Sequence, residues 1–412
     1  MKKITIFTQL LLLLVLSQSC KIETEKKCFF EHFKLKDVLI IDRTNRTYFS
    51  SEIIHNDKIT GDTLITFYQM NDNLIVFLGY GQNTRNDTLH LNSFLETYDI
   101  DRFLDYYYVN SDTIFISTNY MTEDRSRLDY AIFLLDIKGN VYKKWDIAEL
   151  TGIDHVFFNV SSEYFGPNRT IYNKEKQLLF LKTDIIFPPY EAFDVNEVPT
   201  ELVLNIATDE AYFIYAKPDI YGKGDFYGNH ALNHSKAFIN DSTLVLSFPI
   251  DHYLYKYSIT GELLKKKECK SLYIDKMVAF ERGEPVTFNN LVEAQTCYPY
   301  YYQIVYDTKN RYLYRIVHHE QNVLNEVGEK NTEHDRNLSI MVIDENLNII
   351  GEYFIPPYHI IPYLPRINNQ EYLHLQIKGN RNYIIRGIYE YMNYFCKNEE
   401  YQYSNLGLCI FS

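Results

Sequence analysis

The side chains best suited to holding a ligand fall in one glycine-containing connection, K-P-D-I-Y-G-K-G-D-F-Y-G-N-H-A-L-N-H, which covers residues 217–234. Its tyrosine rings could stack on a sugar or a peptide, and its carboxyl and imidazole groups could hydrogen-bond to one. Long connections in compact folds usually have a function. The segment is therefore predicted to bind a polar ligand through Tyr221, Asp225, Tyr227, His230 and His234. The alternative is a packed loop whose aromatic rings cover the edge of a sheet.

Catalytic, metal and cofactor motifs do not stand out in this chain. His230 and His234 are four residues apart, which would suit a metal on a helix, but Gly228 and Asn229 indicate a loop. H-E-x-x-H, G-x-S-x-G, G-x-x-x-x-G-K and G-x-G-x-x-G are all absent from the sequence. We therefore predict no catalytic residue, no metal and no cofactor.

Cys20 carries a different chemistry, the attachment of lipid. Lys2 and Lys3 precede an apolar run from Ile4 to Leu16, which is shorter than the ~20 residues of a membrane-spanning helix. Ser19 and Cys20 follow, as at a lipoprotein cleavage site, although the usual leucine three positions before the cysteine is replaced by serine. The alternative is ordinary signal cleavage that leaves a plain thiol. The sequence thus predicts a signal peptide over 1–19, a lipidated cysteine and tether over 20–36, and one domain over 37–412.

Five cysteines remain once Cys20 is lipidated, and an odd number cannot all pair. Cys396 and Cys409 are the predicted disulfide, which would hold a chain end that otherwise frays. Cys269 and Cys297 are expected to be buried or unpaired thiols.

The acidic charge of the chain limits its partners. The net charge is −13, and removal of Lys2 and Lys3 with the signal makes it 39 − 54 = −15. Such a protein repels nucleic acid and anionic lipid headgroups. The expected partners are a membrane through the lipid anchor and a glycan, peptide or envelope protein, at the cell envelope and on the outer membrane, with the side of that membrane left open.

Repeated short strands are the elements that would position these residues. Asn110–Ile147 and Asn240–Glu268 each contain an Asx-type turn, an alternating apolar strand and a hairpin closed by D-I-K-G-N or S-I-T-G-E. Similar three-strand units cover Asp62–Phe94, Lys176–Ala216, Arg311–Ile355 and, with two clear strands, Glu371–Tyr391.

Six such units predict an all-β fold, a β-propeller of six blades. An N-terminal strand within Asp37–Asp42 or Arg46–Ile54 would complete the last blade. A seventh blade is allowed if Cys269–Tyr302 contains another sheet. A β-sandwich or two stacked β-domains would also give many strands, but neither predicts a repeated unit with the same internal turn.

The segments beginning S-T-L-V-L-S-F-P-I-D-H-Y-L-Y-K-Y at Ser242, Y-Y-Q-I-V-Y-D-T-K-N at Tyr301 and I-M-V-I-D-E-N-L-N-I-I at Ile340 resemble a family of uncharacterised lipoproteins, domain of unknown function 4221. The likeness is strongest over Tyr227–Ile355. The resemblance implies a Gram-negative envelope lipoprotein with a propeller-like fold and no assigned activity.

Three classes of function stay open at this stage. The first is a non-enzymatic binding or interaction module for a glycan, peptide or protein. The second is a glycan-active enzyme whose carboxylates come from several blades and so leave no local motif. The third is a structural subunit of an envelope complex. A tyrosine-lined face at Tyr298–Tyr302 is the second candidate for ligand contact.

Overall fold

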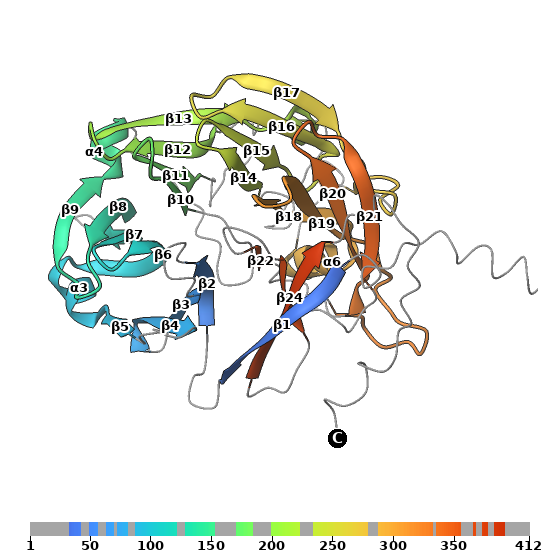
Figure 1. Cartoon of the computed structure of the whole chain (residues 1–412), viewed down its shortest axis with the longest axis horizontal. Helices are drawn as coiled ribbons and strands as arrows, with labels where there is room; N and C mark the ends of the chain where they lie inside the picture. The colour runs from blue at the N-terminus through green and yellow to red at the C-terminus, as the bar shows by residue number, and fades with distance from the viewer. Residues whose placement is uncertain are drawn as a thin grey trace, which may run out of the picture.

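The computed structural model describes residues 33–42, 49–56, 63–69, 72–80, 87–121, 128–152, 170–183, 199–222, 234–278, 287–332, 335–355, 366–367, 373–377 and 383–391. Within these ranges the fold is all-β, and six four-stranded antiparallel sheets follow one another around a common centre (Figure 1). The helices are short, and none in the described part is long and apolar enough to cross a membrane.

Five of these sheets are each formed by four consecutive strands. They are β2 (Phe49–Asn56), β3 (Thr63–Gln69), β4 (Leu74–Tyr80) and β5 (Asp87–His90); β6 (Ile100–Asn110), β7 (Thr113–Met121), β8 (Leu128–Leu135) and β9 (Val141–Asp146); β10 (Thr170–Asn173), β11 (Leu178–Lys182), β12 (Pro199–Asn205) and β13 (Glu210–Ala216); β14 (Ser235–Asn240), β15 (Thr243–Ser247), β16 (Tyr253–Ser258) and β17 (Leu263–Glu268); and β18 (Tyr300–Asp307), β19 (Tyr312–His318), β20 (Leu338–Asp344) and β21 (Ile349–Ile355).

The sixth sheet joins the two ends of the described chain. Its strands are β22 (Arg366–Ile367), β23 (Leu373–Ile377), β24 (Tyr383–Tyr391) and β1 (Phe33–Asp42). β1 pairs antiparallel with β24, from Phe33 opposite Tyr391 to Asp42 opposite Tyr383. The prediction that an N-terminal strand completes the last unit is confirmed, and of the two proposed segments the first, Asp37–Asp42, lies in that strand.

The four-strand order gives every sheet two different ends. The turns between its first and second strands and between its third and fourth strands lie at one end, which we call the turn side. The connection between the second and third strands and the crossover to the next sheet lie at the other, which we call the loop side. The turns are short, as at 136–140 and 345–348, whereas the loop side contains 184–198, 217–234 and 269–299.

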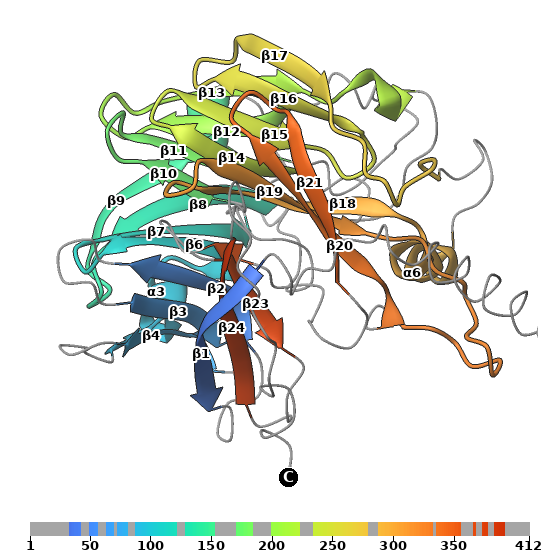
Figure 2. The ribbon, with the colours of Figure 1, turned by 45° about the vertical axis from the view of Figure 1, so that its right-hand side comes forward.

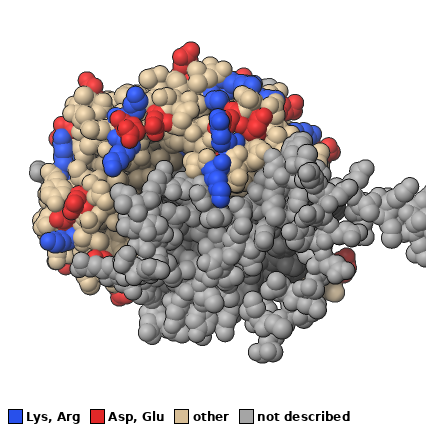
Figure 3. Space-filling model, viewed as in Figure 1, with Lys and Arg blue, Asp and Glu red and all other residues tan. Residues whose placement is uncertain are grey.

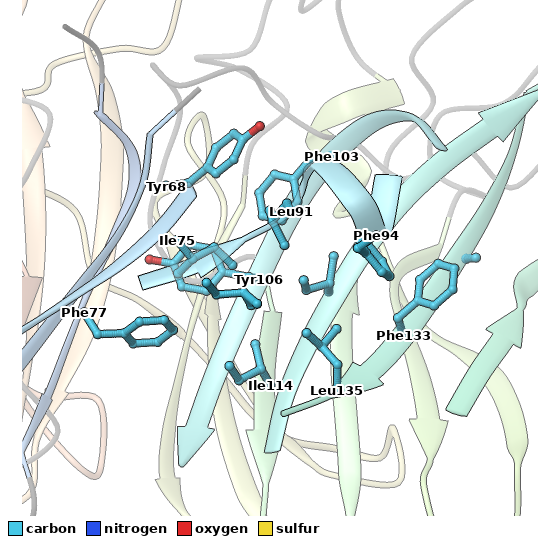
Figure 4. Packing of buried hydrophobic residues seen from close by; sticks show 13 residues of the cluster. Tyr68, Ile75, Phe77, Leu91, Phe94, Phe103, Tyr106, Ile114, Phe133 and Leu135 are labelled. Carbon is cyan, nitrogen blue, oxygen red and sulfur yellow. The ribbon is translucent and has the colours of Figure 1, made fainter. Parts of the chain in front are cut away.

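Hydrophobic side chains fill the spaces between neighbouring sheets. Figure 4 shows one such layer, in which Tyr68, Ile75 and Phe77 from the first sheet pack against Tyr106 and Ile114 from the second. Equivalent layers join the second sheet to the third, the third to the fourth and the fourth to the fifth. The inner strands bury one face against each neighbouring sheet, so their sequences read as nearly continuous apolar residues, as in L-L-F-L-K of β11.

The predicted turn chemistry is confirmed in the repeated units. The Asn110 Oδ1 accepts from the Asp112 amide at 2.9 Å, and the Asn240 Oδ1 accepts from the Ser242 amide at 2.9 Å. Gly139 and Gly261 have φ of +84° and +96° in the outer hairpin turns, where a residue with a side chain would be strained. The Asx turns therefore join the first strand of a sheet to its second.

The three-strand units predicted from the sequence each lack one strand of the observed four-stranded sheet. The missed strand precedes the Asx turn and is the first of its sheet, as with β6, β14 and β18. These strands follow long connections and several carry register shifts, so the alternation that reveals a strand is interrupted in them. Within 269–302 the structure shows α6 (Phe288–Cys297) before β18; it describes no additional sheet there.

The predictions for the cysteines have different outcomes. Cys269 and Cys297 are free and buried, as expected. Cys20, Cys396 and Cys409 lie outside the described residues, as does the signal segment 1–19. The lipid site and the disulfide remain predictions.

Candidate functional site

A group of buried polar side chains lies at the loop side where the second, third and fourth sheets meet. We call it the Glu201 cluster, and its members are Asp105 on β6, Thr170 on β10, Lys182 on β11, Glu201 on β12, and His234 and Lys236 at the start of β14. The Thr170 hydroxyl donates to the Asp105 Oδ2 at 3.2 Å, and Asp105 in turn interacts electrostatically with Lys236. The positive charge of Lys182 disfavours protonation of His234 and so contributes to the lowered pKa of that imidazole.

The position of this cluster follows from the chain order. Lys182 and Glu201 are cross-strand partners on β11 and β12, so they lie on either side of the connection 184–198. His234 and Lys236 directly follow the segment 223–233. Both connections lie outside the described residues. The cluster therefore sits where the two long connections leave and re-enter the sheets.

Glu201 is at the centre of the cluster and is 0% exposed. Its Oε1 accepts a hydrogen bond from the His234 Nε2 at 2.7 Å, and its Oε2 forms an ion pair with the Lys236 ammonium. Burial alone would raise the pKa of this carboxyl group, but Lys236 and His234 outweigh burial and lower it below its usual range. Glu201 is therefore ionised at neutral pH.

Lys236 provides the balancing charge. Its Nζ also approaches the Phe180 carbonyl oxygen at 3.4 Å. Burial lowers its pKa, and Glu201 opposes that effect. One buried carboxylate is thus matched by one buried ammonium group, which is the arrangement that makes a charge tolerable inside a protein.

His234 is neutral and keeps one unused acceptor. Burial lowers its pKa to about 4, against the opposing hydrogen bond to Glu201. Because the ionised Glu201 can only accept, the single proton of the neutral imidazole must be on Nε2. The Nδ1 is then an acceptor, and this buried atom has no hydrogen-bond partner among the residues that the structure describes. A buried acceptor of this kind suits an O–H or N–H group from a ligand or a water molecule.

Two of the five predicted ligand residues are described, and the structure brings them together. Tyr221, in the 3-10 helix η3 (Asp219–Gly222), packs its ring on Phe248 with centroids 6.0 Å apart. His234 packs on the same ring at 5.6 Å. Tyr221 is buried, with the Lys217 ammonium 5.8 Å from its ring centroid. Asp225, Tyr227 and His230 lie outside the described residues.

The charged members of the cluster were missed from the sequence. Lys182 ends the apolar strand L-L-F-L-K, and Glu201 opens the apolar strand P-T-E-L-V-L-N. The sequence signal that could have indicated these site residues is a charged residue at the end of a buried strand, next to a long connection. It could not show that residues from three sheets converge.

The tyrosine-lined face predicted at Tyr298–Tyr302 belongs partly to the hydrophobic core, because Tyr300, Tyr301 and Tyr302 are all buried on β18.

Two other buried polar groups are satisfied by their own surroundings. Arg315 is fully buried, stacks 3.3 Å from the Tyr301 ring centroid and donates to the Ser247 hydroxyl and four backbone carbonyls. The Glu352 Oε1 accepts from Ser271 at 2.6 Å and from Ser339 at 2.5 Å. These contacts hold connections between strands in place. In the described part of the chain, no three His, Cys, Asp or Glu residues are arranged to hold a metal ion.

Sequentially ordered antiparallel sheets around a centre, with a buried polar cluster at the loop side, define a propeller-like all-β protein. The chain belongs to the family described as Domain of unknown function (DUF4221), which it matches over residues 99–353. This confirms the family resemblance found in the sequence.

The fold is similar to the crystal structure of a DUF4221 family member from Bacteroides vulgatus, with a TM-score of 0.65 and 15% identity, covering 88% of this chain and 99% of that chain. At this identity the likeness concerns the fold. A virginiamycin B lyase from Staphylococcus aureus is also similar, with a TM-score of 0.39 and 12% identity over 87% of this chain and 100% of that one. No curated protein matches the chain.

Proposed function

We propose that the chain is a lipid-anchored envelope protein whose propeller-like domain binds a polar ligand, without chemical change, over the Glu201 cluster. The observation that supports this most directly is the buried His234 Nδ1, an acceptor to which no described residue donates, at the base of two long connections. The supporting sequence features are Cys20 after its leader and the stacking residues of 217–234.

The electrostatics favour an uncharged ligand. Asp105 and Glu201 are matched by Lys182 and Lys236, and His234 carries no charge near neutral pH, so the cluster has no net charge. A charged ligand would lose its hydration at a site with no net charge to compensate it. Sugar hydroxyl groups and peptide amides instead offer donors to the Nδ1, and the aromatic residues of 217–234 offer stacking surfaces. A glycan or a peptide is therefore the proposed ligand class.

The proposed architecture around this site is a ring of six blades in one domain, whose predicted range 37–412 is extended to begin at Phe33 because β1 begins there. Its support is the order of the sheets in chain sequence, and the pairing of β1 with β24, which leaves the two ends of the described chain in one sheet. Rigid blades would hold the loop side in a fixed arrangement, which is what a binding module needs.

Glycan-array, peptide-array and pull-down assays test the binding proposal. Tyr227→Ala and His234→Gln should each weaken binding of any ligand found by about tenfold, the effect of one lost contact of about 1.4 kcal/mol. Tyr142→Ala, on the turn side, is the matched control and should bind as wild type. If both loop-side variants bind as tightly as wild type, this site is scaffold and the Tyr298–Tyr302 face becomes the next to test.

A second candidate function, a glycan-active enzyme, has one observation in its favour. Asp105 and Glu201 are buried carboxylates on neighbouring sheets, and glycosidases use two carboxyl groups. Both interact with Lys236, however, which favours two ionised groups instead of the acid and base pair that glycoside cleavage needs. Hydrolysis of a bound glycan by wild type, lost in Asp105→Asn, would support the enzyme and contradict the binding module.

A further inference from the structure

The N-terminal tether leaves the domain at the turn side. Phe33, the first residue of β1, pairs with Tyr391 at the end of β24. In the same way, the start of β21 pairs with the end of β20, and the start of β17 with the end of β16. β1 is therefore the outermost strand of its sheet, and its first residue is equivalent to the first residues of β9, β13, β17 and β21. Equivalent positions of sheets arranged around a centre lie at the same height.

Exposed apolar side chains recur near that position in four consecutive sheets. Within the first three residues of β9, β13, β17 and β21 lie Tyr142 (59% exposed), Tyr212 (37%), Leu263 and Leu264 (both 49%), and Ile349 and Ile350 (43% and 38%). The loop side also exposes apolar residues, among them Leu272, Leu324 and Val327, but these lie on single connections, whereas the turn-side residues repeat from sheet to sheet. The six residues of the outer strands form what we call the turn-side rim (β9, β13, β17 and β21 in Figure 2).

The tether is short enough to keep this rim near the membrane. Cys20 and Phe33 are 33 − 20 = 13 residues apart, which spans at most about 45 Å when extended. Lysines follow the rim residues in sequence, Lys143 and Lys144 on β9 and Lys265–Lys267 on β17. Apolar side chains next to lysines suit the headgroup region of a bilayer. The described face in Figure 3 carries basic side chains among acidic ones, so this surface is not uniformly acidic despite the negative net charge of the chain.

We infer that the domain rests with its turn-side rim against the bilayer and its loop side, with the Glu201 cluster, facing away from the membrane. This inference rests on the proposed anchoring through Cys20. It accounts for the placement of the long connections 184–198, 217–234 and 269–299 on the side away from the membrane. It also leaves the ligand site open to molecules outside the anchoring leaflet.

Lysine reactivity on vesicles tests the orientation without depending on natural lipidation. The chain from residue 21, with an N-terminal histidine tag, is bound to phosphatidylcholine vesicles that contain a nickel-chelating lipid. A membrane-impermeant acylating reagent is then applied, and modified lysines are quantified by mass spectrometry. The exposed turn-side residues Lys174, Lys176 and Lys265 should react several-fold more slowly on vesicles than in solution, whereas the exposed loop-side residues Lys276 and Lys330 should not change.

The rim itself is tested by the pair Leu264→Ser and Ile350→Ser, which should restore the reactivity of the turn-side lysines while the tag still holds the protein on the vesicle. Equal protection of both sides, or protection of the loop-side lysines, would overturn the inference. So would protection in solution that depends on protein concentration, because the rim would then bind a second copy. If fatty-acid labelling of Cys20 fails while the vesicle result holds, the anchor proposal is wrong and the orientation of the domain stands.

Discussion

The Glu201 carboxylate holds two basic side chains that come from the next sheet along the chain. His234 and Lys236 are two residues apart at the start of β14, and both reach Glu201 on β12. The three groups thereby connect the third and fourth sheets through charge as well as through apolar packing. A buried pair of this kind adds little net stability but is costly to break.

Glu201→Gln should lower the free energy of unfolding by about 3 kcal/mol, since it leaves the Lys236 ammonium without its carboxylate. Chemical denaturation at pH 7 measures the change. Glu175→Gln removes an exposed carboxylate from a turn and is the control, expected within about 0.5 kcal/mol of wild type. Equal stability of the two variants would mean that the Glu201–Lys236 pair does not contribute to the free energy of unfolding.

Stability should rise between about pH 4 and pH 6.5 because of His234. In this window the unfolded imidazole binds a proton, whereas the folded one, with its pKa lowered to about 4, does not. The unfolded state binds more protons, so unfolding becomes less favourable as pH rises. The lowered pKa of Glu201 acts in the same direction at the acidic end of the window.

His234→Gln should therefore flatten the dependence of unfolding free energy on pH, by up to about 1.4 kcal/mol per pH unit inside this window. Denaturation curves at half-unit pH intervals measure it. His90→Gln, at an exposed histidine, should leave the slope unchanged. A wild-type slope that persists in His234→Gln would contradict a neutral buried imidazole.

The outer strands combine two requirements, a tight turn at their start and an edge that does not pair with other chains. β17 shows both, because Gly261 makes its turn and Lys265–Lys267 place charges along its edge. The turn also supports the neighbouring sheet, since the Tyr215 hydroxyl donates to the Ser258 carbonyl oxygen at 2.8 Å.

Gly261→Val should destabilise the protein by about 2 kcal/mol, because a β-branched residue is strained at φ of +96° and its Cβ would lie 3.4 Å from the Ile214 Cγ2. Gly261→Asn should cost less, since asparagine tolerates positive φ. The difference between the two variants in thermal or chemical unfolding is the quantity to measure. If both variants cost the same, the loss comes from the added side chain and not from the backbone.

Deletion of residues 33–42 should loosen the sixth sheet selectively, because it removes the strand that pairs with β24 along its length. Hydrogen exchange of the amides in 383–391 should become much faster, while those of β19 in the fifth sheet should keep their protection. Uniform loosening of all sheets would indicate that the domain unfolds as one unit. An unchanged rate at 383–391 would contradict the coupling of the two ends.

The whole molecule has two sides with different tasks under the proposals above. The loop side carries the Glu201 cluster and the long connections, and the turn side carries the rim and the tether. An anchor on the turn side leaves the ligand site unobstructed.

Metabolic labelling with a fatty-acid analogue tests the anchor. Wild-type protein should take up label and partition with membranes, and Cys20→Ala should be unlabelled and either released or left unprocessed. Cys28→Ala, a change at the other cysteine before β1, is the control and should behave as wild type. Absence of label from the wild type would show that the lipoprotein prediction is wrong.

Local patterns in the chain were enough to predict the all-β class, the family, the Asx and glycine turns and the N-terminal strand of the last sheet. These features depend on neighbours a few residues apart, or on a unit that repeats, and both are visible in one dimension. The first strands β6, β14 and β18 were missed because the connections before them and the register shifts interrupt their alternation, and the predicted strand Arg46–Ile54 overlaps β2, the first strand of the first sheet, instead of completing the last.

The Glu201 cluster could be recognised only in the folded chain. Asp105, Lys182, Glu201 and His234 are far apart in sequence and belong to three sheets, so no spacing connects them. Their charge states depend on burial and on each other, as the neutral imidazole of His234 beside an ionised Glu201 shows. The two sides of the domain also emerge only in three dimensions, because the side on which a turn lies depends on how consecutive antiparallel strands are stacked around the centre.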